Sequence, residues 1–157
     1  MPEAAHDEIR QIVIFLSFLA GATLADRVMP VWITDLEPSF GLYSAILGAV
    51  LILSTSVWGA ALLPACAILL GGLTRLYADS IVKAYFSGGD VDVHGLLVNA
   101  AAVPVFFLAA VRGMRSSSML GAMIDRQAAQ CRAQYNREYV ILAITVLGCM
   151  AVLRYII

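Results

Sequence analysis

The longest uncharged stretch of the chain, Pro38–Thr74, reads PSFGLYSAILGAVLILSTSVWGAALLPACAILLGGLT. About 20 helical residues cross the roughly 30 Å hydrocarbon core of a bilayer, so this stretch is too long for one upright helix. Pro64 divides the apolar sequence into Gly41–Leu63 and Ala65–Phe86, and proline kinks or breaks a helix. Two interpretations stay open. Either Pro64 lies in a tight turn between two spans, giving five transmembrane helices, or it kinks one span that continues as an interfacial helix, giving four.

Three further intervals also lack Asp, Glu, Lys and Arg. With their flanking residues, each is long enough for one membrane crossing. The predicted spans are Ile9–Val28, Leu96–Met114 and Tyr139–Ile157.

The composition of the chain also indicates a membrane protein. Hydrophobic residues make up 61% of the chain and charged residues 13%, whereas a soluble domain has about 45–50% apolar and about 25% charged residues. This balance excludes a soluble enzyme, a nucleic-acid-binding protein with a basic surface, a disordered tail and a disulfide-rich secreted module. We therefore predict an all-α, polytopic integral membrane helix bundle that forms a single domain over residues 1–157.

The arginines set the expected orientation of this bundle, because segments rich in Lys and Arg stay in the cytoplasm. Five arginines lie in one segment between two predicted spans: Arg112, Arg115, Arg126, Arg132 and Arg137. We expect this segment to be cytoplasmic. The five-span layout then leaves only Arg27 and Arg154 on the far side, so the charges favour five spans over four.

The segment Met114–Glu138 has the pattern of an amphipathic helix. Apolar residues recur at three- and four-residue spacing through Leu120 and Ile124, with polar residues on the other face. A basic amphipathic helix binds an anionic membrane surface, so Arg126, Arg132 and Arg137 are candidate residues of a cytoplasmic membrane-surface helix. A solvated connector that extends the last span is the alternative.

The most ordered polar feature of the apolar region is the row Arg75, Asp79 and Lys83. These residues stand four apart, so they share one face of a helix and alternate in sign. Charged groups within a span must face protein or water, which makes the row a candidate functional site. A transport role would use Asp79 as a proton or cation site neutralised by Arg75. A self-satisfied row of ions near the membrane interface is the simpler interpretation.

A second set of candidate residues lies within the predicted spans and comprises Asn99, Pro104 and Pro64. An asparagine within a bilayer usually bonds to another helix, and a proline frees a backbone carbonyl that a neighbour can bind. We expect helix packing from these residues rather than substrate binding. Ser54, Thr55 and Ser56 are expected to bond back to their own helix.

Motifs for catalysis or metal binding are not found in the sequence. The two histidines, His6 and His94, stand in or near loops, and no HExxH, phosphate loop or GxSxG elbow occurs. Asp90, Asp92 and His94 alternate in a glycine-rich loop, where solvated charge is more common than a weak cation site. We predict no catalytic, cofactor-binding or metal-binding residues, no cofactor and no nucleic-acid partner.

Small residues at four-residue spacing form three rows, which allow helix backbones to approach closely. The rows are Gly41, Ala45 and Ala49; Ser56 and Ala60; and Ala67 and Gly71.

From Phe15 to Met119 the chain resembles the stage II sporulation protein M family. The first predicted helix closes with FLAGATLAD, in which Gly21, Thr23, Ala25 and Asp26 match the small and polar residues that the family tends to show there. The later marks are Trp58-Gly59 with Pro64, Gly71-Gly72, His94-Gly95, Pro104, and the exit from Arg112 to Ser118. The resemblance implies a non-enzymatic polytopic protein of a bacterial inner membrane. It also implies assembly with peptidoglycan-degrading enzymes during engulfment of the forespore.

These observations together predict a non-enzymatic membrane scaffold or a subunit of a membrane protein complex. The expected partners are the lipid bilayer and other membrane proteins or a second copy of the chain. The alternative is a small transporter or a substrate-binding membrane subunit, with Arg75, Asp79 and Asn99 lining the path.

Overall fold

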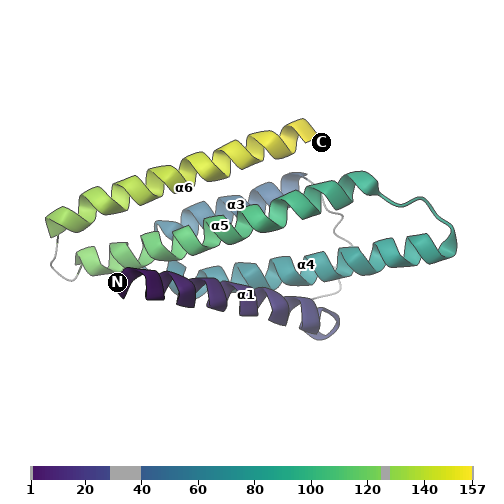
Figure 1. The fold of residues 1–157 in the computed structure, drawn as a ribbon, viewed down its shortest axis with the longest axis horizontal. Helices are drawn as coiled ribbons and strands as arrows, with labels where there is room; N and C mark the ends of the chain where they lie inside the picture. The colour runs from purple at the N-terminus through teal and green to yellow at the C-terminus, as the bar shows by residue number, and fades with distance from the viewer. Residues whose placement is uncertain (1, 29–39, 125–127, 157) are drawn as a thin grey trace.

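The computed structural model describes residues 2–28, 40–124 and 128–156, and these residues form five α-helices without a strand. The helices are α1 (Pro2–Val28), α3 (Phe40–Ser54), α4 (Gly59–Ser87), α5 (Val93–Ile124) and α6 (Ala128–Ile156). Figure 1 shows an elongated bundle in which α1, α4 and α6 run one way and α3 and α5 run back. The all-α helix bundle predicted from the sequence is confirmed.

One end of the bundle holds the start of α1, the turn between α3 and α4, the last turns of α5 and the first turns of α6 (Figure 1). We call it the N-terminal end. The opposite end holds the connection between α4 and α5 and the last turns of α1 and α6.

Four of the described helices are long and apolar enough to cross a membrane. The candidate spans are His6–Ala25, Gly59–Ser87, Val93–Met123 and Arg132–Val152. The fifth helix, α3, is apolar but has 15 residues, which makes it about 22 Å long. It is too short to cross the roughly 30 Å bilayer core by itself.

The break between α3 and α4 lies before Pro64. Residues 55–58 form the turn, and Pro64 is inside α4, in its second turn. The predicted spans Gly41–Leu63 and Ala65–Phe86 therefore differ from the observed helices. The hydroxyls of Ser54 and Thr55 bond to the carbonyls of Leu51 and Ile52, at 2.6 and 2.7 Å. Such side-chain bonds compete with helix continuation, whereas the helix continues through Pro64.

The first turn of α4 is capped from another helix. Trp58 at its N-cap provides no side-chain bond. Instead, the buried hydroxyl of Ser117 in α5 accepts the backbone N–H of Ala60 at 2.9 Å and donates to the carbonyl of Ser56 at 2.7 Å. These bonds satisfy groups that a helix start leaves without partners.

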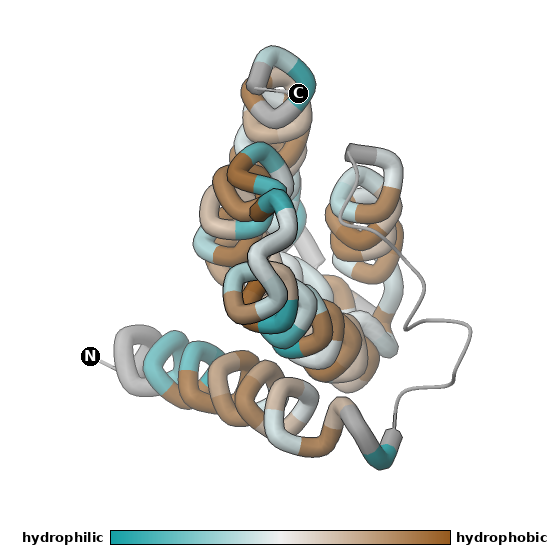
Figure 2. The backbone as a smooth tube through the Cα atoms, turned by 90° about the vertical axis from the view of Figure 1, so that its right-hand side faces the viewer, coloured by the Kyte–Doolittle hydropathy of each residue, from teal (hydrophilic) through white to brown (hydrophobic). Residues whose placement is uncertain are grey.

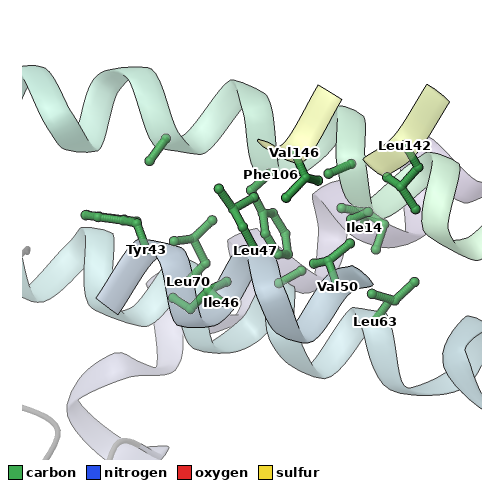
Figure 3. Packing of buried hydrophobic residues seen from close by; sticks show 14 of the residues in the cluster. Ile14, Tyr43, Ile46, Leu47, Val50, Leu63, Leu70, Phe106, Leu142 and Val146 are labelled. Carbon is green, nitrogen blue, oxygen red and sulfur yellow. The ribbon is translucent and has the colours of Figure 1, made fainter. Parts of the chain in front are cut away.

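The core runs along the bundle around α3. Figure 3 shows Tyr43, Leu47 and Val50 of α3 among side chains from the other helices. Phe106 of α5 and Leu142 of α6 are completely or almost completely buried there. Outside this core, large apolar side chains are exposed along the helices. The most exposed on α1, α5 and α6 include Leu16, Leu97, Leu108, Ile144 and Leu147, as expected for helices that face lipid.

The closest helix contact joins α1 and α4 through two glycines. A methyl group on Gly71 would overlap the carbonyl oxygen of Phe18, and one on Gly21 would overlap the carbonyl oxygen of Ile68. The two backbones therefore touch, as in small-residue crossings of membrane helices. The predicted role of the row Ala67 and Gly71 is confirmed, because both residues are buried.

The predicted single helix over Met114–Glu138 is divided between two antiparallel helices. α5 ends at Ile124, and α6 begins at Ala128. The fold brings Arg115 to 3.8 Å from Glu138, whereas one straight helix would hold them about 35 Å apart.

Candidate functional site

The predicted row on α4 contains one ion pair. The Nε of Arg75 lies 3.1 Å from Oδ2 of Asp79, and the Arg75 side chain is half-exposed. Lys83, one turn further on, is exposed and has no ion pair within the described part of the chain. The row stands on the half of α4 nearer the opposite end of the bundle and lines no described cleft.

Asn99 and Tyr43 join α5 to α3 inside the bundle. The Asn99 amide nitrogen donates to the Tyr43 hydroxyl at 2.5 Å, and both residues are buried. The expected interhelical bond of Asn99 is therefore present. Of the two prolines, Pro104 is exposed within α5 and Pro64 is half-buried within α4.

Asp92 caps the start of α5. Its Oδ1 accepts the backbone N–H of Gly95 at 2.9 Å, the bond of an N-cap residue to the third helical residue. The Tyr77 hydroxyl donates to the Asp92 carbonyl at 2.9 Å and lies 3.1 Å from its carboxylate, so α4 is tied to the cap. A Cβ at Gly95 would overlap Oδ2 of Asp92 and the hydroxyl oxygen of Tyr77, so this position requires glycine. This loop carboxylate is therefore a capping group and not merely solvated charge.

The hydrogen bond from the Gly95 backbone lowers the pKa of Asp92. A carboxylate with a lowered pKa in the folded state stabilises the fold above the pKa of the unfolded chain, about 3.9. That contribution is lost as pH falls through the folded-state pKa. We expect Asp92→Asn to lower the melting temperature at pH 7 and to have less effect near pH 3. Thermal unfolding in detergent at several pH values measures the difference, with Asp90→Asn as the control. An equal fall in melting temperature at both pH values would contradict a stabilising role of the Asp92 charge.

A cluster of ion pairs joins three helices at the N-terminal end of the bundle. Asp7 of α1 lies 2.6 Å from Arg10 and 3.4 Å from Arg115 of α5. Arg115 also lies 3.8 Å from Glu138 of α6, so its guanidinium bridges two carboxylates. Arg10 further donates to the Ser118 hydroxyl at 3.0 Å. We call Asp7, Arg10, Arg115 and Glu138 the ion-pair cluster.

Sequence reasoning did not find this cluster. The spacing of Asp7 and Arg10, three residues apart, was a readable signal for their pairing on one helix turn. No local pattern joins Arg115 to Asp7 or Glu138, because these contacts depend on how α1 and α6 pack against α5.

A cleft of about 900 Å³ opens beside the ion-pair cluster. α1 and α6 do not contact each other, and both pack on α5. Figure 2 shows α1, marked by the N-terminus, and α6, marked by the C-terminus, at opposite edges of the bundle. The cleft is lined by residues of α1, α5 and α6: Asp7, Gln11, Ile12, Phe15, Phe107, Leu108, Val111, Arg112, Arg115, Arg137, Glu138 and Ile141.

Two of the arginines in this cleft have no carboxylate partner in residues 2–28, 40–124 and 128–156. They are Arg112, which is half-buried, and Arg137, which is exposed. Of the predicted membrane-surface residues, Arg137 therefore lines the cleft, Arg132 is exposed outside it, and Arg126 lies outside the described residues.

No group of three His, Cys, Asp or Glu residues in the same described ranges could hold a metal ion. Comparison with family models, with curated proteins and with solved structures finds no match to this chain.

Proposed function

We propose that the chain is a multi-pass protein of a bacterial inner membrane that acts as a non-enzymatic scaffold or subunit of a membrane protein complex. The membrane part of the proposal is supported by four helices of sufficient length and apolarity. It is also supported by the large apolar side chains exposed along α1, α5 and α6.

The proposed orientation places the N-terminal end of the bundle in the cytoplasm. Described arginines gather at this end, as the positive-inside rule requires: they are Arg10, Arg112, Arg115, Arg132 and Arg137. The opposite half of the bundle carries fewer described cations, which are Arg27, Arg75, Lys83 and Arg154.

The observation that carries the scaffold role is the small-residue face of α3. Gly41 and Ala45 are exposed, Ala49 is half-buried, and a methyl group on Gly48 would meet nothing within 4 Å. The equivalent row on α4 is used inside the chain for the close contact with α1. The face of α3 has the same chemistry, and these residues are exposed or half-buried among the residues that the structure describes, so the face suits close packing by a helix of a partner or of a second copy.

Other polar groups support a structural rather than a chemical role. The Asn99 amide is bonded to Tyr43, Asp79 to Arg75, and Asp92 to the start of α5. The resemblance to the stage II sporulation protein M family would make the partners peptidoglycan-degrading enzymes.

Photo-crosslinking in the membrane tests the role of the α3 face. A photoreactive residue at Ile52, which is exposed on the same face, should form a protein adduct of discrete mass. A probe at Ile144, equally exposed on α6, is the control and should react mainly with lipid. Ala45→Phe should abolish the Ile52 adduct, because the added ring prevents close approach, and should leave the melting temperature unchanged. Identical products from both probes would contradict the proposal.

A further inference from the structure

The cleft between α1, α5 and α6 has a polarity gradient that is the same on all three walls. On α1 the lining changes from Asp7 and Gln11 at the N-terminal end of the bundle to Phe15 further in. On α5 it changes from Arg115 and Arg112 to Phe107, and on α6 from Arg137 and Glu138 to Ile141. The polar and apolar lining together extends about 12 Å along α1 and α5. An occupant that matches this surface has a polar group at one end and an apolar body at the other.

The charge in the cleft specifies the sign of that polar group. Arg115 is shared by Asp7 and Glu138, and Asp7 is also paired with Arg10. Arg112 and Arg137 then remain as cations of the lining without a carboxylate within the described ranges. The two arginines line the same cleft from different helices, and a guanidinium fork binds phosphate through two parallel hydrogen bonds.

The apolar half of the cleft opens onto surface that faces lipid. Ile12, Phe15 and Leu108 line the cleft and are each more than half-exposed. An acyl chain from the surrounding bilayer can therefore enter sideways without crossing water. The volume of about 900 Å³ lies at the upper end of the roughly 300–1,000 Å³ typical of small-molecule sites.

We propose that this cleft is a binding site for an anionic phospholipid, with the lipid phosphate at Arg112 and Arg137 and one acyl chain along Phe15, Phe107 and Ile141. Basic pockets between membrane helices on the cytoplasmic side are suited to such headgroups. The proposal rests on the membrane placement proposed above and is independent of the scaffold role. The lipid would join α1 to α6, which do not contact each other directly.

Native mass spectrometry of the full chain tests the site. The protein is released from micelles that contain phosphatidylglycerol or phosphatidylcholine with the same acyl chains. We expect phosphatidylglycerol to be retained about tenfold more strongly. Arg112→Gln/Arg137→Gln should remove this preference. Arg132→Gln/Arg154→Gln, which removes the same charge from exposed positions outside the cleft, should leave it unchanged. Equal retention of the two lipids by the wild type, or an unchanged preference in the cleft variant, would overturn the proposal.

Two further arms separate a lipid from a free phosphate and from a folding defect. Glycerol phosphate added alone should not compete with phosphatidylglycerol; effective competition would assign the cleft to a soluble phosphate compound and overturn the lipid assignment. Ile141→Trp, which fills the apolar half, should reduce phosphatidylglycerol retention. Arg112→Lys/Arg137→Lys keeps the charge but lacks the guanidinium fork, so it should retain only part of the preference. A preference equal to that of the wild type would show that the fork geometry plays no part in recognition. Loss of the protein from the membrane fraction would instead contradict the membrane placement.

Discussion

Gly71→Ala should destabilise the bundle by about 3 kcal/mol, the upper part of the range for overpacked sites. The reason is the contact that the added methyl group would make. It would overlap the backbone carbonyl of Phe18 in α1, and a backbone atom in a helix cannot move aside as a flexible side chain can. α1 and α4 must separate, and the packing along their shared face is lost. Gly21→Ala should have the same effect, because its methyl group would overlap the carbonyl of Ile68.

Gly48→Ala and Gly148→Ala are the matched controls. Both glycines lie inside helices, and a methyl group on either would meet nothing within 4 Å. Alanine is favoured over glycine in a helix interior by roughly 0.5–1 kcal/mol, so these variants should be neutral or slightly more stable. Equilibrium unfolding in mixed micelles, followed by circular dichroism, measures all four. Equal stability of Gly71→Ala and Gly48→Ala would show that α1 and α4 do not cross at these glycines.

The second large effect is expected for Arg115→Met. The Arg115 side chain is 23% exposed, and its partners Asp7 and Glu138 are 30% and 17% exposed. Exposed ion pairs contribute roughly 0–1 kcal/mol, whereas breaking a buried pair costs roughly 3–5 kcal/mol. For this partly buried site we expect the free energy of unfolding to fall by about 2 kcal/mol, because two carboxylates lose the cation between them.

A double-mutant cycle isolates the interaction from other effects of the substitution. Asp7→Asn combined with Arg115→Met should show a coupling energy of about 1 kcal/mol. The same cycle at Asp79 and Arg75, an exposed pair on one helix, should give roughly 0.3–0.5 kcal/mol. A coupling at Arg115 no larger than that at Arg75 would mean that the ion-pair cluster does not hold the three helices together.

The distribution of charge was sufficient to predict where most of the helices lie. The uncharged intervals correspond to parts of α1, α5 and α6, and to α3 together with the first half of α4. Asn99 could be recognised as an interhelical donor because a buried amide needs a partner wherever the helix packs. Ala67 and Gly71 could be recognised because close contact requires small residues on one face.

The start of α4 and the cleft could not be predicted in the same way. The helix-breaking tendency of Pro64 predicts a boundary at that residue, whereas α3 ends ten residues earlier, where the hydroxyls of Ser54 and Thr55 bond to backbone carbonyls. The cleft depends on α1 and α6 lying at opposite edges of the bundle, where each packs on α5 and neither contacts the other. Spacing along the chain carries no information about such a gap, so the shared role of Asp7, Arg115 and Glu138 became visible only in three dimensions.

The short length of α3 has a consequence for how the protein enters a membrane. A helix of 15 residues does not reach across the hydrocarbon core of the bilayer, so it inserts poorly by itself. The turn at residues 55–58 joins it directly to α4, which is long enough to cross. Insertion during synthesis should therefore proceed by a helical hairpin in which α4 brings α3 into the bilayer. α1, which leaves the ribosome before α4, acquires its closest neighbour only after Gly71 has been made.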